Sequence, residues 1–389
     1  MRPRTLPLFL AFFVMGFVDA VGPMVAFARK SFALSNAQAG LLTFFPFIAF
    51  AALSVPGGIL AARKGKRFLL LLSLGASALG LALATTTMVW MPTFALLLGS
   101  LLVLGVGMAF LQVAGNPMMR EVSEEGAFAR NLTFAQFIKS LASAANPFVL
   151  GFLTARMGSE HWGLIFPIFL LVTLLCLGAN AGLHVEEAPQ ETGATASLGT
   201  SFALLKDPFV AAVVLGIFLY VGAEVGMAAW SAAHLQGFGL DPKGAQQWGP
   251  GAFFIGLAVG RGTGSLLLRV LSARTALVLS AALGLVGVGL CFGAPSASVA
   301  MAAPLVAGLG FANIWPLVFA LAIDARPARG SEVSGLMVMA IAGGAVLPAL
   351  MGKVADLSTL RMAFTVPLLC FAYLLGFALL GRARREEVA

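Results

Sequence analysis

Two residues of opposite charge, Asp19 and Lys139, lie inside apolar runs that are long enough to cross a membrane. A charge at the centre of a bilayer costs about 2.5–3.5 kcal/mol on insertion scales, so such residues usually line a water-filled path for an ion or a solute. Lys139 would keep Asp19 ionised while the two are close, and burial would favour the protonated acid once they separate. We therefore predict that this pair couples a proton to movement of a solute. The alternatives are a static buried ion pair and a contact between Lys139 and an anionic solute.

Polar residues recur along one face of the helix expected around Lys139. They are Gln136, Lys139, Ser143 and Asn146. Their spacing of three, four and three residues keeps them on one helical face. Gln112 and Asn116 lie one turn apart in the preceding apolar run. Amides both donate and accept hydrogen bonds, which suits a hydroxyl-rich ligand, so we predict that these residues bind the substrate. The alternative, above all for Asn116 and Asn146, is hydrogen bonding between helices.

Three residues of the second half of the chain, Glu224, Asn313 and Trp315, also lie deep in apolar runs. At a rise of about 1.5 Å per residue they reach the same membrane level as the polar residues above. Asp19 falls near the position of Glu224 when the halves are compared. We add the three to the predicted substrate site. The alternatives are a protonated carboxyl bonded to the backbone or Tyr220 for Glu224, and a place at the membrane interface for Trp315.

The composition indicates an integral membrane protein, because 60% of the 389 residues are hydrophobic and only 10% are charged, against about 25% charged in soluble domains. About twenty apolar residues cross the hydrocarbon core as a helix. The candidate spans are 6–27, 38–62, 67–89, 92–119, 129–156, 162–183, 208–234, 244–270, 274–293, 298–324, 331–356 and 361–381. We therefore predict an all-α membrane protein with 12 transmembrane helices.

The sequence lacks the patterns of common catalytic and metal sites. It contains no HExxH, no nucleophile elbow and no Cys/His spacing typical of a metal site. We predict that the protein is not an enzyme and that it uses no metal and no cofactor. The net charge of +8 comes from basic loops, which membrane topology requires, so no nucleic-acid partner is expected.

The two halves of the chain resemble each other. Positions that match about 200 residues apart are Gly105 and Gly308, Gly107 and Gly310, and Pro147 and Pro348. We predict six-helix halves over 1–183 and 208–389, joined by a cytoplasmic linker at 184–207. Parallel six-span repeats are the pattern of major facilitator transporters, whose substrate lies near the midplane between the halves. Sixteen Lys and Arg residues lie on one side of the membrane and six on the other, so the richer side and both termini should be cytoplasmic.

The loop after the second span, residues 58–67, resembles the major facilitator loop signature of a glycine, an Asp-Arg pair, a second glycine and basic residues. The usual aspartate is Ala62 here, which weakens the gating salt bridge that the signature implies. Arg261 occupies the matching place in the eighth span. We predict that Arg63, Arg67 and Arg261 contribute to a cytoplasmic gate.

Several segments resemble the fucose–proton symporter family, which includes bacterial glucose/galactose transporters. They are residues 111–117, 130–136, 220–225 and 334–356. The resemblance implies a major facilitator fold that imports a monosaccharide with a proton. It assigns the family's span-1 carboxylate to Asp19, its polar span-4 site residue to Gln112 and its span-5 glutamine to Gln136. The family commonly has an asparagine where Lys139 stands, and a cation there could select an acidic sugar or replace the coupling ion.

Taken together, these features predict a secondary active transporter that imports a monosaccharide or related sugar with a proton by alternating access. The alternatives are a metabolite or drug exporter or antiporter of the same fold, and uptake of an acidic sugar whose anion contacts Lys139. We expect a proton as the coupling ion, with sodium as the alternative. We also expect a multi-pass monomer in the bacterial cytoplasmic (inner) membrane, with the substrate and the lipid bilayer as its partners.

Overall fold

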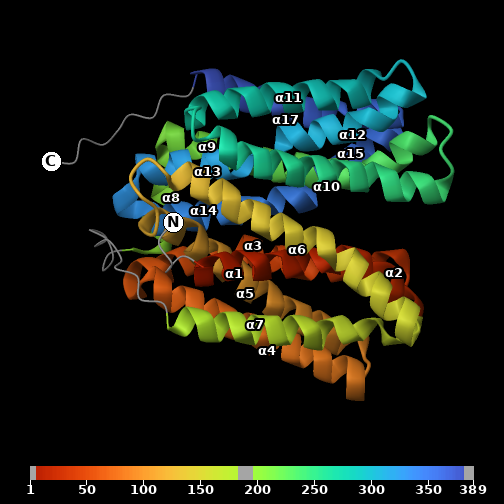
Figure 1. Cartoon of the computed structure of the whole chain (residues 1–389), viewed down its shortest axis with the longest axis horizontal. Helices are drawn as coiled ribbons and strands as arrows, with labels where there is room; N and C mark the ends of the chain where they lie inside the picture. Colours follow the sequence, from red (N-terminus) through yellow and green to blue (C-terminus); the bar gives the residue numbers. More distant parts are fainter. Residues whose placement is uncertain (1–5, 183–195, 381–389) are drawn as a thin grey trace. The chain divides into compact units, whose positions relative to one another are not determined.

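The computed structural model describes residues 6–182 and 196–380, and every regular element within them is helical (Figure 1). The α-helices are α1 (Leu6–Met15), α2 (Val21–Ser31), α3 (Asn36–Lys64), α4 (Lys66–Trp90), α5 (Phe94–Glu121), α6 (Phe128–Met157), α7 (Ile165–Ala181), α8 (Leu198–Ala203), α9 (Pro208–Gln236), α10 (Pro242–Leu267), α11 (Ala273–Gly293), α12 (Ala297–Phe311), α13 (Ile314–Ala325), α14 (Gly330–Met339), α15 (Gly343–Leu357), α16 (Leu360–Ala363) and α17 (Thr365–Leu380). The short 3-10 helices are η2 (Gly16–Ala20), η3 (Ser159–Leu164), η4 (Leu204–Lys206), η5 (Pro327–Arg329) and η6 (Ala340–Ala342).

The long helices confirm the predicted all-α membrane fold. Eleven helical stretches in the described part of the chain are long and apolar enough to cross a membrane. The remaining predicted span, 244–270, corresponds to α10, which has 26 residues. Its sequence includes Arg261, two glutamines and several glycines, which lower its mean hydropathy and explain why it stands apart from the other eleven.

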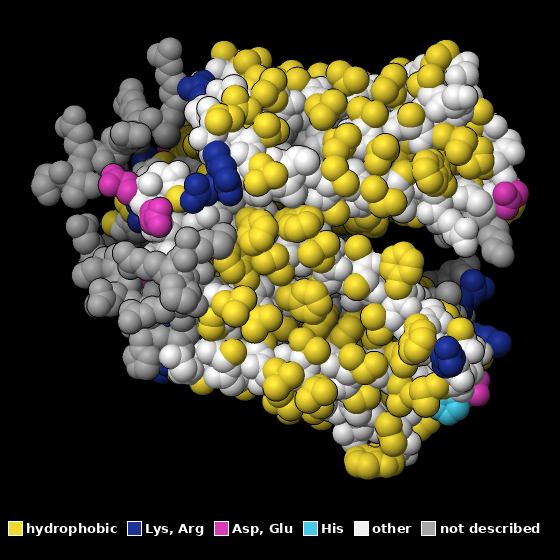
Figure 2. Space-filling view, viewed as in Figure 1, with side chains coloured by type: hydrophobic (Ala, Val, Ile, Leu, Met, Phe, Trp, Pro, Cys, Tyr) yellow, Lys and Arg dark blue, Asp and Glu magenta, His cyan; other side chains and the backbone are white. Residues whose placement is uncertain are grey.

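The surface also fits a lipid environment. On the face that Figure 2 shows, hydrophobic side chains cover the lengths of the helices, whereas Lys, Arg, Asp and Glu gather at helix ends. Large apolar side chains such as Phe148, Leu175 and Leu369 are exposed. Hydrocarbon tolerates such a surface, and helices satisfy their own backbone hydrogen bonds within it. The chain is a multi-pass membrane protein.

The chain divides into two compact units. Among the described residues, those within Met1–Glu124, Ile138–Ser201 and Ala328–Met339 form unit 1, and those within Glu125–Phe137, Phe202–Pro327 and Ala340–Ala389 form unit 2. The chain therefore passes between the units five times: after Glu124, within α6, within α8, within η5, and between α14 and η6. The division into halves at a linker over 184–207 stays a prediction, and residues 184–195 lie outside the described residues.

Matching glycines make matching contacts in the two units. In unit 1, a Cβ on Gly107 would lie 2.3 Å from the Ser77 hydroxyl oxygen of α4. In unit 2, a Cβ on Gly310 would lie 2.1 Å from the backbone nitrogen of Gly284 in α11. Small residues allow such close approach of helices in a membrane, where packing drives association. The glycines that repeat in sequence thus repeat in their packing role.

Two membrane-length stretches are interrupted at predicted site residues. Asp19 lies in η2, which separates α1 from α2, and Asn313 lies at the break between α12 and α13. A 3-10 turn within a helix often marks a functional hinge. Irregular backbone at membrane depth is tolerated where it is buried in protein or lines an aqueous cavity. Both breaks therefore favour the sequence-based assignment of these two positions to a site.

Candidate functional site

In unit 1, the carboxylate of Asp19 meets helix α6. Ser143 Oγ donates a hydrogen bond to Asp19 Oδ2 (2.5 Å), and Asn146 Nδ2 donates to Gly16 O (2.9 Å). Gly16 permits this close contact, because a Cβ there would lie 2.7 Å from the backbone oxygen of Lys139. Two residues of the predicted polar stripe therefore bind the interrupted part of the first span directly.

The two opposite charges of unit 1, Asp19 and Lys139, do not form an ion pair. No ion pair of Lys139 is present among the described residues, and the hydrogen bond to Asp19 comes from a neutral hydroxyl. The side chain of Asp19 is exposed and that of Lys139 is half-buried. Helix packing in unit 1 thus buries neither charge completely.

The amides predicted on α5 belong to the same unit. Gln112 and Asn116 are buried, in a part of α5 where every residue from Leu111 to Met119 is buried. Gly115 lies against the first span, since a Cβ there would lie 2.7 Å from Met15 Cε. Unit 1 therefore holds Asp19, Lys139, Ser143 and Asn146 together with both amides of α5.

In unit 2, the deep carboxylate has a cationic partner. Arg261 Nη2 lies 3.5 Å from Glu224 Oε1, and Arg261 Nε donates to Ala312 O (3.2 Å). The arginine is 6% exposed. Tyr220 is buried, and its hydroxyl has no hydrogen-bond partner among the described residues. Glu224 thus belongs to a buried ionic cluster that the sequence did not reveal.

Other predicted site residues also lie in unit 2. Asn313 Nδ2 donates to Ser280 Oγ (3.5 Å), and Gly264 makes room for the Asn313 amide. Trp315 is buried, and its indole nitrogen has no hydrogen-bond partner in the described part of the chain. Gln136 is buried and falls in unit 2, although it shares α6 with Lys139. The predicted substrate residues are therefore distributed over both units.

The predicted gate residues have separate surroundings. In unit 1, Arg63 Nε donates to Ala196 O (2.9 Å) and Arg67 Nη2 donates to Ala181 O (2.8 Å). Arg261 instead binds Glu224 in unit 2. The gating role of all three stays a prediction.

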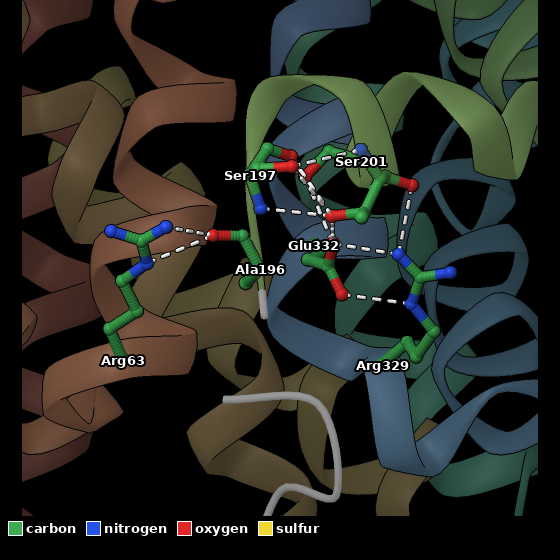
Figure 3. A network of polar contacts seen from close by, with 7 residues as sticks. Arg63, Ala196, Ser197, Ser201, Arg329 and Glu332 are labelled. Carbon is green, nitrogen blue, oxygen red and sulfur yellow. Dashed lines mark hydrogen bonds and ion pairs between the residues drawn. The ribbon is translucent and has the colours of Figure 1, made fainter. Parts of the chain in front are cut away.

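Sequence reasoning missed two buried ionic groups in unit 1. Lys66 forms an ion pair with Glu121, with both side chains 7% exposed. Glu332 is bound by Arg329 and by two hydroxyls of the segment before α9 (Figure 3). Most of these contacts join residues far apart in sequence, so the sequence did not predict them. The exception is Arg329, whose spacing of three residues from Glu332 could have predicted an ion pair on one helix.

No group of three or more His, Cys, Asp or Glu side chains that could hold a metal ion is present among the described residues. The three cysteines are unpaired and buried. The expectation that the protein works without a metal or cofactor remains a prediction.

Comparisons with known proteins show which proteins this chain resembles in sequence and in fold. The model of the family described as Major Facilitator Superfamily matches residues 8–349. The glucose/galactose transporter of Brucella abortus is 29% identical over 96% of this chain and 92% of its own. The L-fucose-proton symporter of Haemophilus influenzae is 23% identical over 92% of each chain. A crystal structure of the E. coli fucose:proton symporter has the same fold, with a TM-score of 0.85 at 20% identity over 97% of this chain and 98% of that one.

These similarities agree with the resemblance carried by the sequence motifs. The superfamily match spans nearly the whole described chain and both units. Proteins of this family are transporters rather than enzymes. From its helical architecture, its internal repeat and this match, the chain belongs to the Major Facilitator Superfamily.

Proposed function

We propose that this protein imports a monosaccharide or a related sugar together with a proton, by alternating access of one site to the two sides of the membrane. Membership of the superfamily and similarity to glucose/galactose transporters and L-fucose-proton symporters support this function. The observation that carries it is the position of Asp19. Its carboxylate lies at a helix break, accepts a hydrogen bond from Ser143 and is exposed, so it can exchange a proton.

The proton has a defined task in this mechanism. Protonation removes the charge of Asp19, so the loaded site can change its exposure without an uncompensated carboxylate in a low-dielectric environment. Gln112 and Gln136 hydrogen-bond to sugar hydroxyls, which they can meet as donors or acceptors. Loss of the proton on the cytoplasmic side then restores the ionised acid and favours release. The inward proton gradient drives accumulation of the sugar.

The Asp19→Asn variant tests the coupling. Asparagine keeps the size of the side chain and an oxygen that accepts from Ser143, but it cannot ionise. We expect purified variant in proteoliposomes to lose uphill uptake of a labelled hexose under an inward proton gradient and to retain counterflow exchange. Asp241→Asn, which changes an exposed helix-capping aspartate outside the site, is the matched control. Undiminished uphill uptake in Asp19→Asn would refute the role, and accumulation driven by a sodium gradient would identify sodium as the coupling ion.

A second candidate is uptake of an acidic sugar, and the surroundings of Lys139 favour it. Lys139 is half-buried and has no ion pair among the described residues, so its ammonium group can bind a carboxylate of the substrate. Thermal-shift screening of neutral, acidic and amino sugars at two pH values separates the candidates. Stabilisation of the wild type by uronates, lost in Lys139→Met, supports the acidic sugar. Equal stabilisation of both proteins by neutral hexoses supports the first proposal.

The direction and setting of transport are also proposals. The excess of Lys and Arg on one side supports a bacterial inner-membrane protein with both termini in the cytoplasm, working as a monomer. Flux of the labelled sugar in vesicles of known orientation distinguishes import from export or antiport. Import requires accumulation toward the face that carries the termini.

A further inference from the structure

Glu332, in the first turn of α14, is a buried carboxylate that the proposed proton coupling does not use. It is 1% exposed. Arg329 Nε donates to Oε2 (2.8 Å) and Arg329 Nη2 donates to Oε1 (2.7 Å). The hydroxyls of Thr200 and Ser201 each donate to Oε1 at 3.1 Å. Figure 3 shows these donors converging on the one carboxylate. So many partners make a buried charge tolerable.

The two hydroxyls belong to a short segment that reaches a second helix. We call this segment, Ala196–Ser201, the strap. At its start, Ala196 O accepts from Arg63, which lies in the last turn of α3. At its end, Thr200 O accepts from Arg329 Nη2 (2.8 Å), in addition to the bonds to Glu332. The strap therefore joins the end of α3 to the start of α14 (Figure 3).

Helices α3 and α14 also touch directly, backbone to backbone. A Cβ on Gly58 would lie 2.6 Å from Ser331 O, and a Cβ on Gly335 would lie 2.8 Å from Ser54 O. Helix α14 comes late in the chain, yet it belongs to unit 1, and the residues from Ala340 onward belong to unit 2. The contact of α14 with α3 thus holds a late segment of the chain within the first unit.

We propose that the strap clamps α14 against α3 and that Glu332 is the positioning residue of this clamp. The inference rests on the proposed transport by alternating access, which requires helices at one end of the molecule to separate and rejoin. As long as both ends of the strap are bound, α14 cannot leave α3. The hydrogen bond from Arg63 to the strap lies beside Ala62, the residue that stands where the gating signature has an aspartate.

The two ends of the strap differ in how easily they release. Arg63 is exposed, and its partner among the described residues is one carbonyl oxygen. The Glu332 end is buried and has bonds from a guanidinium and two hydroxyls. Water can replace the carbonyl at the exposed end, whereas the buried carboxylate would lose partners that nothing replaces. The Arg63 end therefore opens first, and the strap moves with α14.

Reactivity of an introduced cysteine measures the separation of the two helices. Ser54→Cys places a thiol at a position in α3 that is 0% exposed and lies at the contact with Gly335. The full-length protein carries it in a background whose three native cysteines are replaced by alanine. The readout is the alkylation rate by a maleimide in proteoliposomes without added sugar, because the thiol reacts only when α14 has left α3.

The decisive variant removes the hydroxyls of the strap and keeps the Arg329–Glu332 pair. We expect Thr200→Val/Ser201→Ala to raise the alkylation rate about tenfold, the population change that losing about one net hydrogen-bond energy produces. Glu332→Ala should raise it further, and Arg63→Gln should also raise it. A merely local role of Glu332 in the first turn of α14 would leave the rate of the hydroxyl variant at the wild-type value.

Glu121→Gln is the matched control, because it breaks a buried ion pair of the same unit whose two members, Lys66 and Glu121, lie outside the strap. Its alkylation rate should equal that of the wild type. A wild-type rate in Thr200→Val/Ser201→Ala overturns the clamp, even if Glu332→Ala does not fold, and so does an equal increase in Glu121→Gln. Labelling needs no sugar, so wild-type protein that fails to transport sugars contradicts the proposed function alone. Normal transport with unresponsive labelling contradicts the clamp alone.

Discussion

Each unit contains a carboxylate deep in a long helical stretch, and the two are satisfied in different ways. In unit 1, Asp19 accepts a hydrogen bond from the neutral hydroxyl of Ser143 and is exposed. In unit 2, Glu224 lies 3.5 Å from the guanidinium of Arg261, which is buried and bound to a backbone carbonyl. The first carboxylate thus meets a neutral hydrogen-bond donor and the second meets a cation.

The partner, rather than the position, therefore separates the two roles. Asp19 and Glu224 fall at similar places in the first and seventh spans of the internal repeat. The repeat alone would assign both to the same task. The contacts instead give Asp19 a neutral donor and Glu224 a cation, so we predict a carboxylate that switches in unit 1 and a structural ion pair in unit 2.

The largest effect should come from breaking the pair in unit 2. Glu224→Gln leaves Arg261 buried without its anion, and breaking a buried ion pair from one side costs about 3–5 kcal/mol. Because the Glu224 side chain is 19% exposed, we expect the low end, about 3 kcal/mol of unfolding free energy. Thermal unfolding in detergent should show a clear drop in Tm. The pH dependence of the remaining uptake should stay that of the wild type.

The double variant Glu224→Gln/Arg261→Met controls for the lost charge. It removes both members of the pair, so it should recover most of the Tm lost in the single variant. A wild-type Tm in Glu224→Gln, together with an altered pH dependence of uptake, would assign proton coupling to unit 2 and reverse the comparison.

The next effect concerns Lys139, the cation that lies one turn before Ser143 on α6. Lys139→Met keeps the length of the side chain and removes its charge. Hydrogen bonds to charged groups contribute about 1.5–3 kcal/mol, so affinity for an acidic sugar should fall about 10- to 100-fold, and the pH optimum of uptake should move. Binding titrations with uronates and neutral hexoses measure the first change. Lys353→Met, at an exposed lysine of unit 2, is the control. An unchanged substrate range and pH profile would count against any role of Lys139.

Much of the fold follows from the sequence for a physical reason. Hydrocarbon demands long apolar helices, so the spans are visible as runs of apolar residues. Helical periodicity fixes which residues share a face, so the stripe on α6 correctly placed Ser143 and Asn146 together. Both hydrogen-bond to the first span, which is the alternative that the sequence offered, and their role in binding the substrate stays a prediction.

Contacts between helices were less accessible to sequence reasoning. Periodicity gives a face but no partner and no register, so the pairing of Glu224 with Arg261, 37 residues away, was not foreseen. Glu332 lies just inside the start of its predicted span, where an acidic residue is common. Its hydroxyl partners Thr200 and Ser201 lie 132 and 131 residues earlier. Helix α6 also begins in unit 2 and continues in unit 1, so Gln136 and Lys139 belong to different units. Their shared helical face did not predict this division.

A smaller effect should follow from removing the neutral donor in unit 1. Ser143→Ala deletes the hydrogen bond to Asp19, and one net hydrogen bond contributes about 0.5–1.5 kcal/mol. Without this positioning contact, the rate of uphill uptake should fall about two- to tenfold. Uptake of a labelled hexose in proteoliposomes measures this change. Ser140→Ala, in the same turn of α6, is the control and should keep the wild-type rate. An unchanged rate in Ser143→Ala would show that the hydroxyl does not position Asp19 for coupling.

The smallest expected loss of stability concerns the Asp207–Arg326 ion pair of unit 2. Asp207 lies directly before α9, and the pair serves as a reference for the Glu224–Arg261 pair. Asp207 accepts from Phe209 N (2.8 Å) and from Arg326 Nε (3.1 Å). Burial alone would raise the pKa of Asp207, but the hydrogen bonds and charge of Arg326, with the amides of Phe209 and Val210, outweigh it and lower the pKa below 3.8.

A pKa that is lower in the folded state means that the ionised Asp207 stabilises the fold above its ordinary pKa. That contribution is lost as the pH falls through the lowered value. Asp207→Asn keeps a good helix cap but loses the ion pair, so we expect a loss of about 1 kcal/mol or less at pH 7. The difference from the wild type should shrink at about pH 3, below the ordinary carboxylate pKa. Thermal unfolding at both pH values tests this. A difference that is the same at both would mean that ionisation of Asp207 is not its source. A loss as large as that of Glu224→Gln would remove the contrast between a pair at the start of α9 and a pair deep in that helix.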